Sequence, residues 1–130
     1  MTVRKRSTLV IFGLLVAALA LVASSCGGSD DGGAEVVALP TSSCTGIEYE
    51  GEGDPDVLIA SDLPMQGPSN VQTSQMVAAV RQVLTNSEWK AGDYNVAYQV
   101  CDDSTAQAAN YDTGKCSQNA NNYAANDKVI

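Results

Sequence analysis

The stretch that decides the fold is VLIASDLPMQGPSN, residues 57–70. Its first four residues form an unbroken apolar run of strand length, which favours a strand covered on both faces, as in a parallel sheet. Pro64 and the pair Gly67-Pro68 then break the chain. The stretch therefore predicts a buried strand followed by an irregular loop.

A helical period begins after Asn70 and predicts an amphipathic helix of about four turns. Its expected apolar stripe consists of Met76, Val77, Val80, Val83 and Leu84. After a turn at residues 90–93, residues 94–101 have the composition of a second strand. Asp112 is the candidate N-cap of a second helix, which would turn one face inward: Cys116, Ala120, Tyr123 and Ala124.

Residues 128–130, Lys-Val-Ile, have the composition of a third strand that is just starting. The order strand, helix, strand, helix, strand is typical of an α/β fold and predicts a parallel βαβαβ unit. A central strand that begins at residue 128 has nothing after it to cover its faces. We therefore expect the chain to be an N-terminal fragment of a longer α/β domain.

The first 25 residues have the pattern of a secretory signal peptide. Basic residues at positions 4–6 precede an uncharged, mostly apolar run at 9–23, shorter than the roughly 20 residues that a spanning helix needs. The segment VASSC at 22–26 resembles the lipobox of bacterial lipoproteins, which implies cleavage before Cys26, a lipid on its thiol and a location on the extracytoplasmic face of the cell membrane. An ordinary signal peptide is the alternative.

Glycine-rich residues 27–33 follow Cys26 and are typical of a flexible tether. The predicted organisation is therefore a lipoprotein signal peptide at 1–25, a lipidated cysteine and flexible tether at 26–55, and a partial lobe at 56–130.

Composition excludes several classes of function. The 130 residues carry 7 Lys+Arg, 15 Asp+Glu and no His, for a net charge of -8, so nucleic-acid binding is not expected. Without His there is no Ser-His or Cys-His nucleophile, and the cysteines lack Cys-x-x-Cys spacing. Asp102 and Asp103 favour a solvated turn over a Ca²⁺ site, because neighbouring side chains of an extended chain point to opposite sides. We expect no enzymatic activity, cofactor or metal.

Three cysteines lie beyond Cys26: Cys44, Cys101 and Cys116. We predict a disulfide between Cys101, at the end of the second strand, and Cys116, in the first turns of the following helix, because a helix folded back onto the sheet can bring them together. Two buried free thiols are the alternative. Cys44 is then the odd cysteine.

The order of these elements resembles the N-terminal lobe of the type I periplasmic solute-binding proteins, the group that includes the leucine-isoleucine-valine-binding proteins of ABC importers. The resemblance rests on the strand at 57–60, the LPMQGP loop at 63–68, the helix after it, the VCDD strand end at 100–103 and the NDKVI run at 126–130. It implies a flavodoxin-like lobe, a small polar solute such as an amino acid, and an ABC permease as membrane partner.

In doubly wound sheets ligands bind beyond the carboxyl ends of the strands, at the switch point. The resemblance places the loop at 61–72 there and implies a set of ligand contacts: Gly67, Pro68, Ser69, Asn70 and Gln72. A plain strand-to-helix turn capped by Ser69 or Asn70 is the alternative. The family often has an aromatic residue where this chain has Gln72, which argues against a branched-chain ligand.

These features together predict a lipid-anchored binding protein that captures a solute outside the membrane and delivers it to a permease. A ligand-sensing receptor lipoprotein of the same fold, without a transport role, is the alternative. Because such proteins gain affinity by enclosing the ligand between two lobes, a single lobe is expected to bind only weakly.

Overall fold

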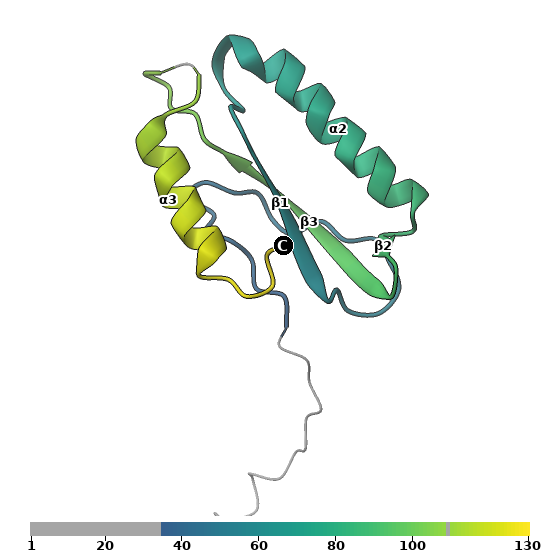
Figure 1. The fold of residues 1–130 in the computed structure, drawn as a ribbon. Coiled ribbons are helices and arrows are strands. Elements are labelled where there is room, and N and C mark those ends of the chain that lie inside the picture. The colour runs from purple at the N-terminus through teal and green to yellow at the C-terminus, as the bar shows by residue number, and fades with distance from the viewer. Residues whose placement is uncertain (1–34, 109) are drawn as a thin grey trace, which may run out of the picture. The chain divides into compact units, whose positions relative to one another are not determined.

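The computed structural model describes residues 35–108 and 110–130. At its centre, strands β1 (Val57–Leu63) and β3 (Tyr94–Asp102) pair in parallel and are connected through helix α2 (Asn70–Asn86) (Figure 1). The register runs from Val57↔Val96 to Leu63↔Asp102. The predicted strand, helix and strand are confirmed, and the described chain is a small α/β domain.

Strand β3 is paired along both edges, and the sheet is mixed. β1 lies along one edge. On the other edge, β2 (Lys90–Ala91) and then residues 43–48 pair antiparallel with β3, the latter through the bridges Cys44↔Cys101 and Glu48↔Tyr98. The prediction of a wholly parallel sheet is therefore wrong at this edge. β2 is connected to β3 by a tight turn, and residues 43–48 come from the N-terminal side of the chain. Antiparallel pairing of either segment therefore needs no long crossover of the kind that a parallel neighbour requires.

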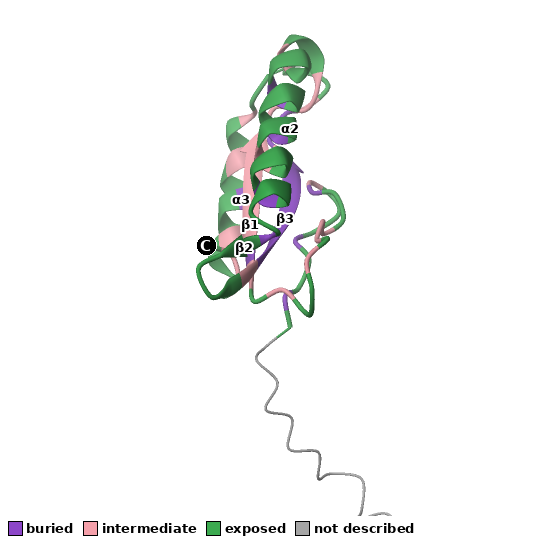
Figure 2. Cartoon of the chain, turned by 90° about the vertical axis from the view of Figure 1, so that its right-hand side faces the viewer, coloured by how far each residue is buried: buried purple, intermediate pink, exposed green. Residues whose placement is uncertain are grey.

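Side chains of β1 and β3 alternate between two apolar layers, as the strand period of two requires. Helix α2 covers the first layer, whose buried members are Val77, Leu84, Trp89, Val96, Tyr98 and Val100. Helix α3 (Thr113–Ala124) and the N-terminal segment cover the second, whose buried members are Val36, Leu39, Cys44, Leu58, Ala97 and Cys101. Figure 1 shows the two helices on opposite sides of the strands, and Figure 2 shows that β3 is mostly buried.

Helix α2 ends in a Schellman motif, which turns the chain back toward the sheet. Trp89 N donates a hydrogen bond to Leu84 O at 2.7 Å, and Glu88 N donates to Thr85 O at 3.1 Å. Glu88 adopts the left-handed φ of 55° that the motif requires. Trp89 is buried behind the helix end and packs edge-on against Tyr49, with ring centroids 6.0 Å apart.

The apolar stripe of α2 is narrower than the sequence predicts. Val77 and Leu84 are buried, whereas Met76 and Val83 are exposed. The helix rests on a sheet with only two long strands, so only the side chains directly above those strands are removed from water.

Helix α3 begins as predicted. The Oδ1 atom of its N-cap Asp112 accepts a hydrogen bond from the third backbone N–H of the helix at 2.9 Å. Its inward residues are Cys116, Asn119 and Tyr123, while the two alanines of the predicted face are exposed. The spacing i, i+3, i+7 is helical as expected, but a fully buried asparagine takes the place that the pattern assigned to an alanine.

Residues 35–55 belong to the packed domain. Gln99 is completely buried; its Nε2 donates to Leu39 O at 3.2 Å and its Oε1 accepts from Leu39 N at 2.8 Å. Leu39 and Val36 are buried in the second apolar layer. The tether predicted for 26–55 therefore does not extend over 35–55, because a buried glutamine holds this segment across the sheet.

The disulfide joins Cys44 to Cys101, so the predicted Cys101–Cys116 bond is wrong. The antiparallel pairing of residues 43–48 with β3 sets Cys44 directly opposite Cys101. Thr45 N donates to Val100 O and Asp102 N donates to Ser43 O, both at 2.8 Å, on either side of the pair. Cys116 is a free, half-buried thiol.

Val129 pairs in parallel with Leu58, on the edge of β1 that faces away from β3. Leu58 N donates to Lys128 O at 2.7 Å, and Ile130 N donates to Leu58 O at 3.1 Å. The C-terminus accordingly lies beside β1 in Figure 1. Where the sequence predicts a third strand, residues 128–130 thus contact β1 through an isolated bridge and do not form a strand.

The predicted signal peptide at 1–25 and the predicted lipidation site Cys26 lie outside the described residues. Within the described part of the chain, neither helix has the length and apolar character needed to cross a membrane.

We predict that replacing both Cys44 and Cys101 by Ser lowers the free energy of unfolding by about 4 kcal/mol, the chain-entropy value for a loop of this size. The bond closes a sequence separation of 57 residues and pins the N-terminal segment to β3. Urea denaturation measures the loss. Cys116→Ser serves as the matched control, since it leaves the disulfide intact. Non-reducing peptide mapping that links Cys101 to Cys116 would contradict the assignment.

Candidate functional site

The carboxyl ends of β1 and β3 lie side by side, because the strands are parallel and Leu63 is in register with Asp102. The chain leaves β1 through residues 64–66, forms the short 3-10 helix η1 (Gly67–Ser69) and enters α2. The chain leaves β3 through Asp103 and Ser104. This end of a parallel sheet is the usual place for ligands in α/β proteins.

Asp102 holds the loop after β1 in place. Its Oδ1 accepts hydrogen bonds from Met65 N at 3.0 Å and Ser104 N at 2.8 Å, and its Oδ2 accepts from Gln66 Nε2 at 2.7 Å. The Lys115 ammonium lies 3.4 Å from Oδ2. Burial by itself would raise the pKa of Asp102, but the hydrogen bonds from Ser104, Gln66 and Met65 outweigh it and hold the pKa well below its usual range. Asp102 is therefore an ionised structural acceptor.

Two further contacts fix the same loop. Gln66 N donates to Ser104 Oγ at 3.1 Å, which ties the loop to the chain after β3. Thr73 Oγ1 donates to Pro64 O at 2.8 Å, which ties it to the first turns of α2. The loop is thus held from both sides before any ligand arrives.

The residues that the resemblance singles out for ligand contact lie along η1 and the start of α2. Gly67 has a left-handed φ of 69°, which its lack of a side chain makes easy. Asn70 accepts a hydrogen bond from Ser74 Oγ at 2.8 Å, and the Ser69 side chain does not cap α2. Pro68, Asn70 and Gln72 are exposed, and Ser69 is half-buried. The structure brings these residues together on one surface segment at the carboxyl end of the sheet.

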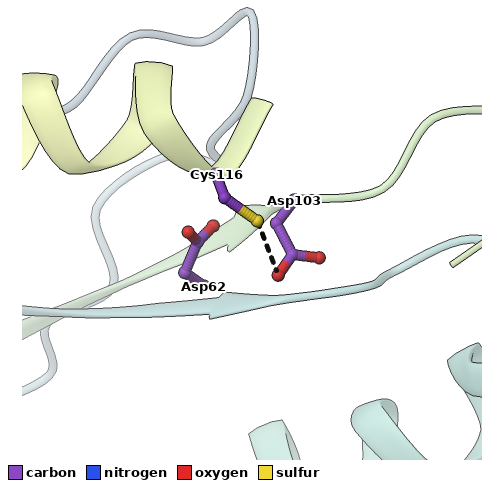
Figure 3. Close-up of side chains that lie close together, drawn as sticks. All are labelled: Asp62, Asp103 and Cys116. Carbon is purple, nitrogen blue, oxygen red and sulfur yellow. Dashed lines mark hydrogen bonds between the residues drawn. The ribbon is translucent and has the colours of Figure 1, made fainter. Parts of the chain in front are cut away.

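A second group lies on the α3 side of the sheet and consists of Asp62, Asp103 and Cys116. One ligand atom from each residue lies within 4.8 Å of the others. Cys116 Sγ donates to Asp103 Oδ2 at 3.7 Å, and Figure 3 shows the sulfur pointing between the two carboxylates. Asn119 Nδ2 donates to Asp62 Oδ1 at 2.8 Å and to Asp102 O at 3.3 Å. We call these three residues the acidic thiol cluster.

The electrostatics of the acidic thiol cluster disfavour additional negative charge. Burial, and then the nearby Asp62, raise the pKa of Asp103. Burial, and then the carboxylates of Asp103 and Asp62, raise the pKa of Cys116. Burial followed by the charge of Asp62 also raises the pKa of Tyr123, far above its usual range. Cys116 is thus held as a thiol, which is the opposite of what a nucleophilic cysteine needs.

Three buried polar atoms around this cluster have no hydrogen-bond partner among the described residues: Asp103 Oδ1, Asn119 Oδ1 and the Tyr123 hydroxyl. Each unpaired buried group costs about 1–3 kcal/mol, so such groups are rare, and a bound water or ion is one of the causes that explain them. Because these unpaired atoms lie close together, the region around the acidic thiol cluster differs from the rest of the described interior, whose buried side-chain polar atoms are paired.

Sequence reasoning identified the Gly67-Pro68 loop but missed most of the residues that fix it. Gln66 lies in the loop at 63–68, and Asp102 and Asp103 are adjacent carboxylates at a strand end, so these residues had a sequence signal. Neither Asp62 nor Asn119 had a sequence signal, because the side chains that they contact lie on other elements. Asp102 and Asp103 point to opposite faces of the sheet, as predicted for neighbours in an extended chain. The predicted solvated turn is wrong, because Asp103 is buried and each carboxylate enters a different hydrogen-bond network.

Comparisons with protein-family models, with curated proteins and with solved structures find no match to this chain.

We predict that Asp102→Ala lowers the free energy of unfolding by about 2–3 kcal/mol, because it leaves several part-buried donors unpaired. Asp102→Asn keeps an acceptor oxygen and costs less, about 1–2 kcal/mol. Urea denaturation gives both values, and amide hydrogen exchange should accelerate at Met65 and Ser104. Asp93→Asn, an exposed carboxylate in the turn after β2, is the matched control. Equal losses at Asp93 and Asp102 would contradict the assigned role.

Proposed function

We propose that the protein is the lipid-anchored, extracytoplasmic solute-binding component of an ABC importer, and that it captures an amino acid or a similar small polar solute. The observation that carries the proposal is the pairing of Val129 with Leu58. With β3 on one edge of β1 and residues 128–130 on the other, the chain moves in opposite directions from β1. This reversal supports a switch point at the carboxyl end of β1, which is the arrangement proposed for a flavodoxin-like lobe.

The loop after β1 lies at this switch point and suits a polar ligand. It offers exposed backbone at Gly67 and Pro68 and polar side chains at Ser69, Asn70 and Gln72. Asp102 anchors the loop, so little conformational freedom is lost when a solute binds.

The chemistry of the described residues favours binding over catalysis. The sequence has no histidine to serve as a general base, and Cys116 is held as a thiol. Asp102 and Asp103 do not form an acid–base pair, because Asp102 is hydrogen-bonded to its loop and the side chain of Asp103 is buried.

The N-terminal sequence supports the place of action. A basic start, an apolar run and the VASSC segment precede Cys26, and a glycine-rich stretch follows it. A lipid on Cys26 would hold the binding domain at the membrane surface near a permease. An importer role predicts that deletion of the protein abolishes solute uptake, whereas a purely sensory role would leave uptake intact.

We predict that Cys26 carries the lipid. Expression in bacteria with a clickable fatty acid should label the protein, and Cys26→Ala should abolish the label because the acyl chain is attached through that thiol. Cys116→Ala provides a matched control that removes a different cysteine. Undiminished labelling of Cys26→Ala, or equal loss in the control, would contradict lipidation at this residue.

We also predict weak solute binding at the loop. In ¹⁵N-labelled full chain in detergent, millimolar amino acids or amides should shift amide resonances within residues 64–72 and leave those of α3 unchanged. Gln72→Ala should weaken the effect, because it removes a polar contact. Gln75→Ala changes the same residue type at an exposed site further along α2 and should not. Shifts spread over the whole domain, or none with any polar solute, would contradict the proposed site.

A further inference from the structure

The acidic thiol cluster assembles from three separate elements. Asp62 comes from the end of β1, Asp103 follows β3, and Cys116 lies in the second turn of α3. Their side chains converge on one point of the α3 face, with the candidate ligand atoms within 4.8 Å of one another (Figure 3). These residues lie apart from the proposed ligand loop, which runs along η1 and the start of α2.

The surroundings of the cluster are unusually short of hydrogen bonds. Asp103 is 7% exposed and Asn119 is 0% exposed, yet Asp103 Oδ1 and Asn119 Oδ1 have no partner among the described residues. The Asn119 amide faces the cluster, because its Nδ2 binds Asp62. Two carboxylates and a thiol packed this closely have only one donated hydrogen bond among themselves, from Cys116 to Asp103. Buried oxygens that lack donors are what a cation would satisfy.

We propose that Asp62, Asp103 and Cys116 form a binding site for a divalent cation of the Zn²⁺ type. The donor set selects the metal: a cysteine sulfur favours Zn²⁺ over Mg²⁺ and Ca²⁺, while carboxylate oxygens are also accepted by Zn²⁺. Three protein ligands leave a fourth tetrahedral position for water. Asn119 does not bind the metal in this arrangement; it orients the Asp62 carboxylate through its amide, as outer residues commonly do at metal sites.

The geometry needs only a small adjustment. Ligand atoms around Zn²⁺ at usual bond lengths lie roughly 3.5 Å apart. The separation of Cys116 Sγ and Asp103 Oδ2 is already 3.7 Å, and the whole set lies within 4.8 Å. Asp62 and Cys116 are half-buried, so the site can be reached from solvent.

Binding exchanges a proton for the metal. The Cys116 S–H bond breaks, the proton leaves to solvent, and the sulfur donates its electron pair to Zn²⁺ without any change of oxidation state. Two carboxylates and one thiolate carry three negative charges, which the cation reduces to one. The same cation removes the repulsion between Asp62 and Asp103 and links β1, the end of β3 and α3.

The test uses the full chain with Cys26→Ala, in which Cys116 is the one thiol outside the Cys44–Cys101 disulfide. Cd²⁺ serves as the spectroscopic probe, because a cadmium–thiolate bond gives an ultraviolet charge-transfer band. We expect the band to saturate at one Cd²⁺ per chain, to disappear in Cys116→Ser, and to require at least about tenfold more Cd²⁺ in Asp62→Asn. Asp93→Asn, an exposed carboxylate elsewhere, should titrate like the parent.

A second measurement needs no substitution in the cluster. Zn²⁺ should slow the alkylation of Cys116 by iodoacetamide at least about tenfold, because the metal occupies the sulfur electron pair. Saturating Zn²⁺ should also raise the melting temperature by several degrees, since it binds the folded chain. An unchanged alkylation rate, or a Cd²⁺ titration that weakens equally in Asp93→Asn, would overturn the proposal. The first result would indicate that water fills the cluster, and the second that the metal binds diffusely to an acidic surface.

Discussion

The rest of the structure depends on the burial of β3. Residues Val96 to Cys101 are all buried, so every main-chain group of this strand must be paired and both of its faces covered. β1 pairs with one edge, while β2 and residues 43–48 share the other. The buried side chain of Gln99 is paired as well, because its amide forms two hydrogen bonds with the backbone of Leu39. The N-terminal segment is therefore a structural member of the sheet, and the Cys44–Cys101 bond secures it.

The same strand sets the position of both polar networks. Because successive side chains of β3 point to opposite faces, Asp102 turns toward the loop after β1 and Asp103 toward α3. One network consists of charged hydrogen bonds that hold a loop in place. The other gathers groups whose charges repel and whose hydrogen bonds are incomplete. A difference of one residue along the chain thus separates the satisfied structural network of Asp102 from the proposed cation site at Asp103.

Much of the local structure was predictable because it depends on neighbours in sequence. The apolar run at 57–60, the break at Gly67-Pro68 and the Asp112 cap each act over a few residues, and the strand, loop and helix that they predict are present. The disulfide was not predictable in this way. Cys116 is close to Cys101 in sequence and follows it onto the sheet, but Cys44 lies directly opposite Cys101 once residues 43–48 pair with β3. Long-range pairing overrode the shorter connection.

The sequence by itself determined the α/β character of the domain, the parallel pairing expected of its two main strands and the loop at their carboxyl end, because periodicity and chain breakers act locally. It also determined the acidic charge and the absence of histidine, which limit the available chemistry. Only the tertiary structure decided that residues 35–55 pack against the sheet and that Asp102 anchors the loop after β1. It also decided that the side chains of Asp62, Asp103 and Cys116 lie close together. Those contacts join residues from separate elements, and strand register and helix packing, rather than any sequence spacing, bring them within reach.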